Sequence, residues 1–144
     1  MKRLTLLLLL VAGTMGLTAQ ESVLGTWKSI DDETGEAKSH VQIFKKGDQV
    51  YGKIVKILTE KGDEALCEAC KGKRKNQPVL GMTIIESLEQ ENDGRWRGGD
   101  ILDPESGNTY GCVIWVPEGK SDELKVRGRH WTGLYRTQTW FRVK

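Results

Sequence analysis

The chain has 144 residues, of which 22 are Lys or Arg and 20 are Asp or Glu, so its formal net charge is +2. Recognition of nucleic acid needs a concentrated basic surface, and this near balance of charge argues against that function class. The length suits one domain with one hydrophobic core, and 17 glycines against 3 prolines indicate many tight turns rather than a disordered linker.

The first residues have the layout of a secretory signal peptide. Lys2 and Arg3 precede an apolar run over 4–12, and small residues follow as far as Ala19. The run is too short to span a bilayer as a permanent helix, and no later run is longer. We therefore expect 1–19 to be cleaved and 20–144 to be one exported domain, periplasmic or secreted. Without Lys2 and Arg3 the 22 basic residues become 20, equal to the 20 acidic ones.

The exported part of the chain predicts strand after strand, separated by turns. Apolar and polar residues alternate in short segments, and Gly47-Asp48, 92–94 and 103–108 are turn sequences. The predicted strands, in chain order, are 24–30, 39–45, 49–58, 79–88, 95–102, 109–116, 123–130 and 136–143, of which 79–88 could also be a short helix. Eight strands at regular spacing predict an all-β sandwich or barrel. Glycines inside several strands favour the barrel, because they allow the bending that closes a small sheet.

The charged segment 59–78 is predicted to be one long loop, and it contains Cys67 and Cys70. In an oxidising compartment this Cys-x-x-Cys predicts a structural disulfide, with Cys112 left as a buried thiol. Two alternatives are a redox motif and a metal site completed by Cys112, His40 or His130. The basic run 71–75 is interpreted as a solvated loop rather than a binding site for anions.

Candidate ligand-binding residues are five of the ring-bearing side chains of the predicted strands. They are Tyr51, Trp96, Tyr110, Trp115 and His130. Such residues could line a pocket in the barrel, or they could simply fill its core, because eight-stranded barrels have little free interior. His130 alternates with Leu124 and Val126, which is more typical of a core residue. The acidic residues at 100, 103 and 105 are explained by a hairpin turn.

The two ends of the predicted barrel resemble those of lipocalin-like proteins. Gly25 and Trp27 lie on the first strand and Arg142 on the last. In lipocalin-like barrels such a tryptophan closes one end and an arginine of the final strand stacks over it. The resemblance implies that Gly25, Trp27 and Arg142 form this closure, with a cation–π contact of roughly 0.5–2 kcal/mol.

An ordered set of motifs covers nearly all of the exported chain. These motifs are CEACKG (67–72), PVLGM (78–82), WRGGDILDPESG (96–107), Tyr110, LKVRG (124–128) and RTQTW (136–140). Together they resemble a family of bacterial secreted proteins known as domain of unknown function twenty-one forty-seven. The resemblance implies a lipocalin-like barrel and supplies no catalytic residues.

The sequence thus predicts a single eight-stranded antiparallel lipocalin-like barrel with one long loop. We expect a non-enzymatic binding protein that takes a small apolar or amphipathic ligand in the barrel, without a cofactor or metal. The alternatives are a filled barrel that acts as an interaction module of the cell envelope, and a thiol or metal protein that uses Cys67 and Cys70.

Overall fold

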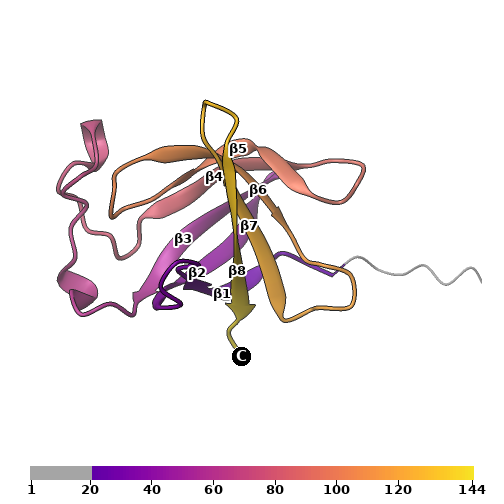
Figure 1. Ribbon diagram of the computed structural model, residues 1–144, viewed down its shortest axis with the longest axis horizontal. Helices are drawn as coiled ribbons and strands as arrows, with labels where there is room; N and C mark the ends of the chain where they lie inside the picture. Colours follow the sequence, from indigo (N-terminus) through magenta and orange to yellow (C-terminus); the bar gives the residue numbers. More distant parts are fainter. Residues whose placement is uncertain (1–20) are drawn as a thin grey trace, which may run out of the picture.

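The structure is a computed structural model that describes residues 21–144, so the predicted signal peptide over 1–19 lies outside the described residues. The described chain forms an all-β barrel with one long connection, which confirms the predicted fold class (Figure 1). Its strands are β1 (Gly25–Ile30), β2 (Ala37–Lys46), β3 (Gln49–Ile57), β4 (Thr83–Gln90), β5 (Trp96–Leu102), β6 (Thr109–Trp115), β7 (Glu123–Arg129) and β8 (Tyr135–Arg142). Two short 3-10 helices, η1 (Gly62–Glu64) and η2 (Gly72–Arg74), lie between β3 and β4.

Alternation of side chains along each strand places the core inside the barrel. In β2 the buried residues Ser39, Val41 and Ile43 alternate with partly exposed neighbours, and in β7 Leu124 and Val126 do the same. This period of two directs one face of the sheet inward and the other to solvent. Within residues 21–144, no helix has the length and apolar character that crossing a membrane requires.

Every strand is antiparallel to the next in the chain, and β8 returns to pair with β1. The connections therefore alternate between the two ends of the barrel. The residues 47–48, 91–95 and 116–122 connect strands at one end, which we call the closed end. The residues 31–36, 58–82, 103–108 and 130–134 connect strands at the other end, which we call the mouth.

Trp27 and Arg142 seal the closed end. The Trp27 side chain is fully buried and donates a hydrogen bond from Nε1 to the carbonyl oxygen of Val23, at 2.8 Å. The guanidinium carbon of Arg142 lies 4.1 Å from the centroid of the Trp27 ring, in the stacked arrangement that the resemblance implies. The guanidinium also donates hydrogen bonds to the backbone carbonyl oxygens of Ser22, Leu24 and Ser121. Gly25 leaves room for it, because a Cβ there would lie 3.0 Å from the Arg142 Nη1.

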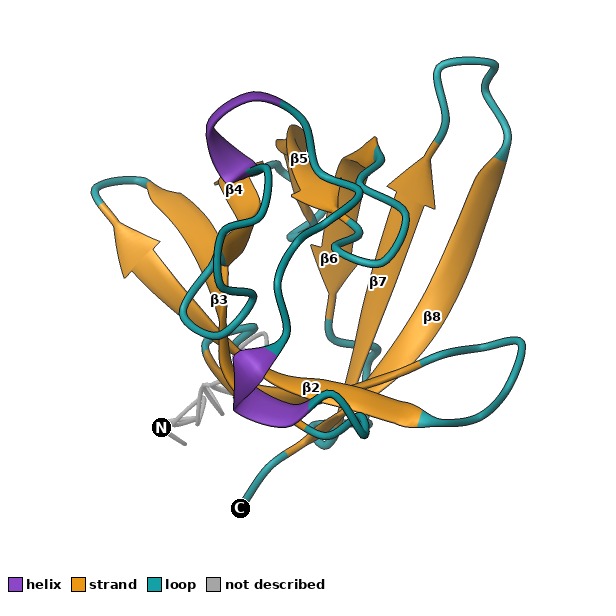
Figure 2. Cartoon of the chain, turned by 90° about the vertical axis from the view of Figure 1, so that its left-hand side faces the viewer, coloured by secondary structure: helices purple, strands orange, loops and turns teal. Residues whose placement is uncertain are grey.

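The seam between β1 and β8 is the shortest pairing of the barrel. Two residue pairs, Trp27 with Arg142 and Lys28 with Phe141, join these strands at the closed end, whereas seven pairs join β7 to β8. Toward the mouth, the β7–β8 hairpin stands away from β1 and β2 (Figure 2).

Candidate functional site at the barrel mouth

The inner wall of the barrel is buried at depth and accessible to solvent near the mouth. On β6 the inward-facing series runs from half-buried Tyr110 to buried Cys112 and Ile114. On β8 it runs from exposed Arg136 through half-buried Gln138 to buried Trp140. Neighbouring β5 and β7 show the same trend. We use the name mouth wall for four half-buried, inward-facing residues of these strands, Ile101, Tyr110, Gly128 and Gln138.

The register of the strands shows that these residues form one surface. Ile101 of β5 is paired with Tyr110 of β6, and Cys112 of β6 is paired with Gly128 of β7. A Cβ on Gly128 would lie 3.4 Å from the Cβ of Tyr110, so the tyrosine side chain lies beside the bare backbone of Gly128. Four successive strands therefore supply a partly apolar wall that a ligand could contact.

Of the five predicted ligand-binding residues, the structure brings two together at the mouth. The rings of Tyr110 and His130 are 6.3 Å apart, between centroids. Trp96 is also inward-facing, but it is buried at the closed end, at the start of β5. Tyr51 and Trp115 lie on the outer face of the barrel, because each alternates with buried inward-facing residues.

The two outward aromatic side chains have partners on the barrel surface. Tyr51 stacks on Phe44 with a centroid separation of 6.0 Å. The guanidinium carbons of Arg95 and Arg127 lie 4.2 and 5.1 Å from the centroid of the Trp115 ring. These contacts give both rings a surface role and remove them from the mouth wall.

His130 is exposed, which corrects the expectation of a core histidine. It lies one residue beyond the end of β7, where the hairpin turns away from the barrel, and its Nδ1 is 2.9 Å from the hydroxyl of Thr132. His40 lies on β2, and burial, Lys56 and Lys28 hold the pKa of its imidazole below the ordinary value. The two histidines do not converge on a shared site.

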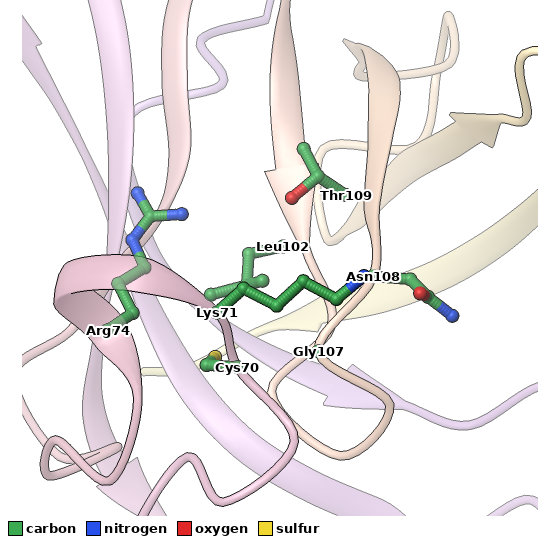
Figure 3. Close-up of a pocket in the computed structure, with 7 residues that line it drawn as sticks. All are labelled: Cys70, Lys71, Arg74, Leu102, Gly107, Asn108 and Thr109. Carbon is green, nitrogen blue, oxygen red and sulfur yellow. The ribbon is translucent and has the colours of Figure 1, made fainter.

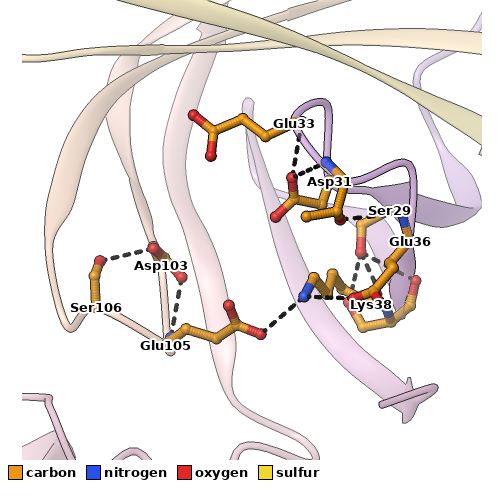
Figure 4. Close-up of polar contacts among 10 residues, drawn as sticks. Ser29, Asp31, Glu33, Glu36, Lys38, Asp103, Glu105 and Ser106 are labelled. Atoms are coloured by element: carbon orange, nitrogen blue, oxygen red, sulfur yellow. Dashed lines mark hydrogen bonds and ion pairs between the residues drawn. The ribbon is translucent and has the colours of Figure 1, made fainter.

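Charged side chains link the loops around the mouth (Figure 4). Lys38 of β2 forms ion pairs with Glu36 and with Glu105 of the β5–β6 turn, at 3.3 and 3.4 Å. Across the β1–β8 seam, Arg136 pairs with Asp32 and Glu33 of the β1–β2 loop.

The β1–β2 loop that supplies these carboxylates is held by its own backbone. The amides of Thr34 and Glu33 donate to the carboxylate of Asp31 and hold its pKa below the ordinary value. The rim of the mouth is thus polar, whereas its wall is partly apolar.

The loop 58–82 covers the outer face of β4 and β5. Ile84 and Leu102 point outward by alternation, yet both are buried. Over them lie Cys67 and Cys70, which are buried and joined in the predicted disulfide, now confirmed. While this disulfide is intact, neither sulfur is available as a metal ligand or as a thiolate.

The disulfide segment packs tightly on the β5–β6 turn. The Cys67 sulfur is 3.4 Å from the carbonyl oxygen of Pro104. Gly107 has a φ of +72°, and a Cβ on it would lie only 2.0 Å from the carbonyl oxygen of Ala69. An ion pair of 2.9 Å between Arg74 and Glu86 fastens the same loop to β4.

A hollow of about 270 Å³ lies between the disulfide loop and the outer face of β5 and β6. Figure 3 shows the long side chain of Lys71 crossing it in front of Leu102, with Arg74 at one side. Its lining residues are Cys70, Lys71, Arg74, Leu102, Gly107, Asn108 and Thr109. The hollow is largely polar and separated from the mouth wall by the sheet itself.

Cys112 is a free thiol buried in the inner wall below Tyr110. Burial raises the pKa of this thiol far above its ordinary value, and the negative charge of Asp100 adds to the effect. The folded state therefore keeps Cys112 neutral and unreactive.

We expect Cys112 to react with a thiol-specific disulfide reagent at pH 8 only when the chain unfolds. Since the folded pKa is raised, the stability linked to this group is present at neutral pH and declines as pH rises above about 8.5. Urea unfolding from pH 7 to 10 should show this decline, and Cys112→Ala should reduce it. Fast labelling of the native protein would contradict the expectation.

A family model described as an uncharacterized protein conserved in bacteria (DUF2147) matches residues 25–142. The chain belongs to this family. The match spans all eight strands, from the start of β1 to the end of β8.

The fold is similar to that of a solved structure, protein HP1028 from Helicobacter pylori, described as belonging to the lipocalin family. The two share 16% sequence identity and a TM-score of 0.72, over 85% of this chain and 84% of that chain. This likeness supports the lipocalin-like architecture. No curated protein is detectably similar to the chain.

Proposed function

We propose that this member of the family is an exported, non-enzymatic binding protein that holds a small apolar or amphipathic ligand against the mouth wall. The observation that carries the proposal is the change from buried to accessible inward-facing residues along β5, β6, β7 and β8. The lipocalin-like fold supports the proposal, because it is a barrel with one closed end and one open end. The signal-like start of the sequence and the Cys67–Cys70 disulfide support export.

The mouth wall offers both apolar and polar contacts. Ile101 and the ring of Tyr110 provide apolar surface, whose burial against a ligand contributes about 25 cal/mol per Å². The amide of Gln138 and the charged rim lie near enough to the opening to contact a polar end of the same ligand. The Gln138 amide is already oriented, since its Oε1 accepts from Trp140 Nε1 and its Nε2 donates to Asp32.

Two glycines on adjacent strands provide a matched test. Gly128 belongs to the mouth wall and faces the barrel interior. Gly111 alternates with Tyr110 and Cys112 and faces outward. Neither has a positive φ, and a Cβ on Gly111 would meet nothing closer than 3.8 Å. We expect Gly128→Val to weaken binding of cis-parinaric acid, a fluorescent fatty acid, by at least about tenfold. Gly111→Val should bind as the native chain does.

The measurement is fluorescence titration of both variants and the native chain, with circular dichroism to show that all three are folded. Equal affinity in the two variants would place the ligand elsewhere on the protein. No saturable binding to the native chain, with this probe or with an anilinonaphthalene sulfonate, would contradict the proposed binding of apolar ligands.

A further inference from the structure

The β7–β8 hairpin ends in exposed apolar side chains. Trp131 is 89% exposed, Leu134 76% and Tyr135 63%. We call residues 130–135 the hairpin tip. The His130 amide donates to the carbonyl oxygen of Leu134 at 2.8 Å, and the Gly133 amide donates to that of His130 at 2.9 Å. The tip is therefore a hydrogen-bonded turn that presents its apolar groups on a fixed frame.

The tip extends past its neighbours in the barrel. Arg129, the last residue of β7, is paired with Gly111, which is already near the start of β6. Residues beyond Arg129 therefore extend past the start of β6. On the other side of the hairpin, the mouth end of β8 is not paired with β1. Both views show the hairpin rising beyond the adjacent strands (Figures 1 and 2).

Cationic groups lie directly beneath the apolar tip. The guanidinium of Arg127 is 4.4 Å from the Tyr135 ring centroid, and Arg129 is exposed. Arg136 is neutralised by Asp32 and Glu33 of the facing loop. Residues 124–141 of the hairpin contain four Lys or Arg and no Asp or Glu. The acidic residue of β7, Glu123, lies at the closed end, where it pairs with Lys120 and Lys125.

This combination matches the interface of a membrane. Trp and Tyr prefer the headgroup level of a bilayer, where an apolar ring and a polar edge are both satisfied, and arginines nearby attract anionic lipid. A protein partner fits less well, because a stable interface buries about 800 Å² on each side. Three side chains on a narrow turn supply only a few hundred Å².

We propose that the hairpin tip inserts into the interface of a bilayer that contains anionic phospholipid, with Trp131 and Leu134 as its apolar anchors. The mouth wall opens at the same end of the barrel, so docking would place it at the membrane surface. The docking itself does not depend on ligand binding at the mouth.

The test is co-sedimentation with vesicles of phosphatidylcholine and phosphatidylglycerol. The protein is recovered from the periplasm of a bacterial host, and its intact mass shows whether 1–19 have been removed. Trp131→Ser combined with Leu134→Ser should weaken partitioning at least about tenfold, because roughly 60 Å² of lost apolar burial already suffices for that factor. Arg129→Gln should weaken it about fivefold, and added salt should weaken it as well.

The matched control is Phe141→Ser, which removes a 42% exposed apolar side chain at the closed end of β8 and should leave partitioning unchanged. Equal partitioning of the native chain and the double variant would overturn the inference, as would absence of vesicle binding or equal binding to pure phosphatidylcholine. Titration of the double variant with cis-parinaric acid in solution separates the two proposals. We expect the double variant to bind the probe as the native chain does. A native chain that binds the probe but not the vesicles would remove the membrane inference alone.

Discussion

Trp27→Ala is expected to lower the free energy of unfolding by about 3–5 kcal/mol, the range for truncating a large buried aromatic residue. The side chain has no exposed surface, its Nε1 is hydrogen-bonded to Val23, and Arg142 stacks on its ring. Its removal leaves a cavity at the closed end and deprives Arg142 of the surface that orients it. Urea unfolding monitored by circular dichroism measures the loss.

Trp131→Ala is the control for this prediction. It makes the same substitution at a tryptophan that is 89% exposed, so we expect a change within about 0.5 kcal/mol. Similar losses for the two variants would contradict a special structural role for Trp27. A loss below about 1 kcal/mol for Trp27→Ala would show that the closed end tolerates the cavity.

Gly107→Ala is expected to destabilise the barrel much more than Gly119→Ala, although both glycines have nearly the same backbone angle. Their φ values are +72° and +73°. A left-handed alanine costs about 1–2 kcal/mol at either position. At Gly107 the new Cβ would also lie 2.0 Å from the Ala69 carbonyl oxygen, whereas at Gly119 it would meet nothing within 4 Å. Overpacking adds about 1–3 kcal/mol at the first position alone.

A second measurement locates the cause of this difference. If the alanine pushes the disulfide segment off the β5–β6 turn, the buried Cys67–Cys70 bond becomes accessible, and dithiothreitol should reduce it faster in Gly107→Ala than in Gly119→Ala. Equal stability and equal reduction rates would show that the contact with Ala69 relaxes without consequence.

The strand pattern predicted a sandwich or a barrel, and the interior glycines and the lipocalin-like resemblance favoured the barrel. Eight alternating segments between turn sequences correspond to β1–β8, and their bounds agree within two residues except at the start of β4, predicted at 79 instead of Thr83. The segment 79–82 belongs to the long loop, where Val79 and Met82 pack on the core and so mimic a strand's apolar residues. The closure by Trp27 and Arg142 followed from family resemblance, not from the pattern.

The position of the candidate ligand site was harder to predict, although part of the signal was present. Tyr51 lies next to the apolar residue Val50, and Trp115 lies next to Ile114. Because neighbouring residues of a strand face opposite ways, the sequence already predicts that Tyr51 and Trp115 face outward. The candidates were chosen because they are aromatic, without regard to which face of the strand they occupy. The same choice overlooked Ile101, Gly128 and Gln138, which belong to the mouth wall. The antiparallel order further places Trp96 at the closed end.

Other features depend on tertiary contacts that no local pattern encodes. Leu102 and Ile84 face outward and would be expected to be exposed, but the disulfide loop covers them. Ion pairs such as those of Arg136 with the β1–β2 loop join residues more than 100 positions apart. His130 loses its core position because β7 ends one residue before it.

The pairing of the first strand with the last has a consequence for how the protein is made. Trp27 on β1 acquires its covering guanidinium from Arg142 on β8, so closure waits for the last strand of the barrel. During synthesis, which starts at the amino end, the earlier strands can form only an open ribbon. The cylinder closes only once β8 is available to pair with β1.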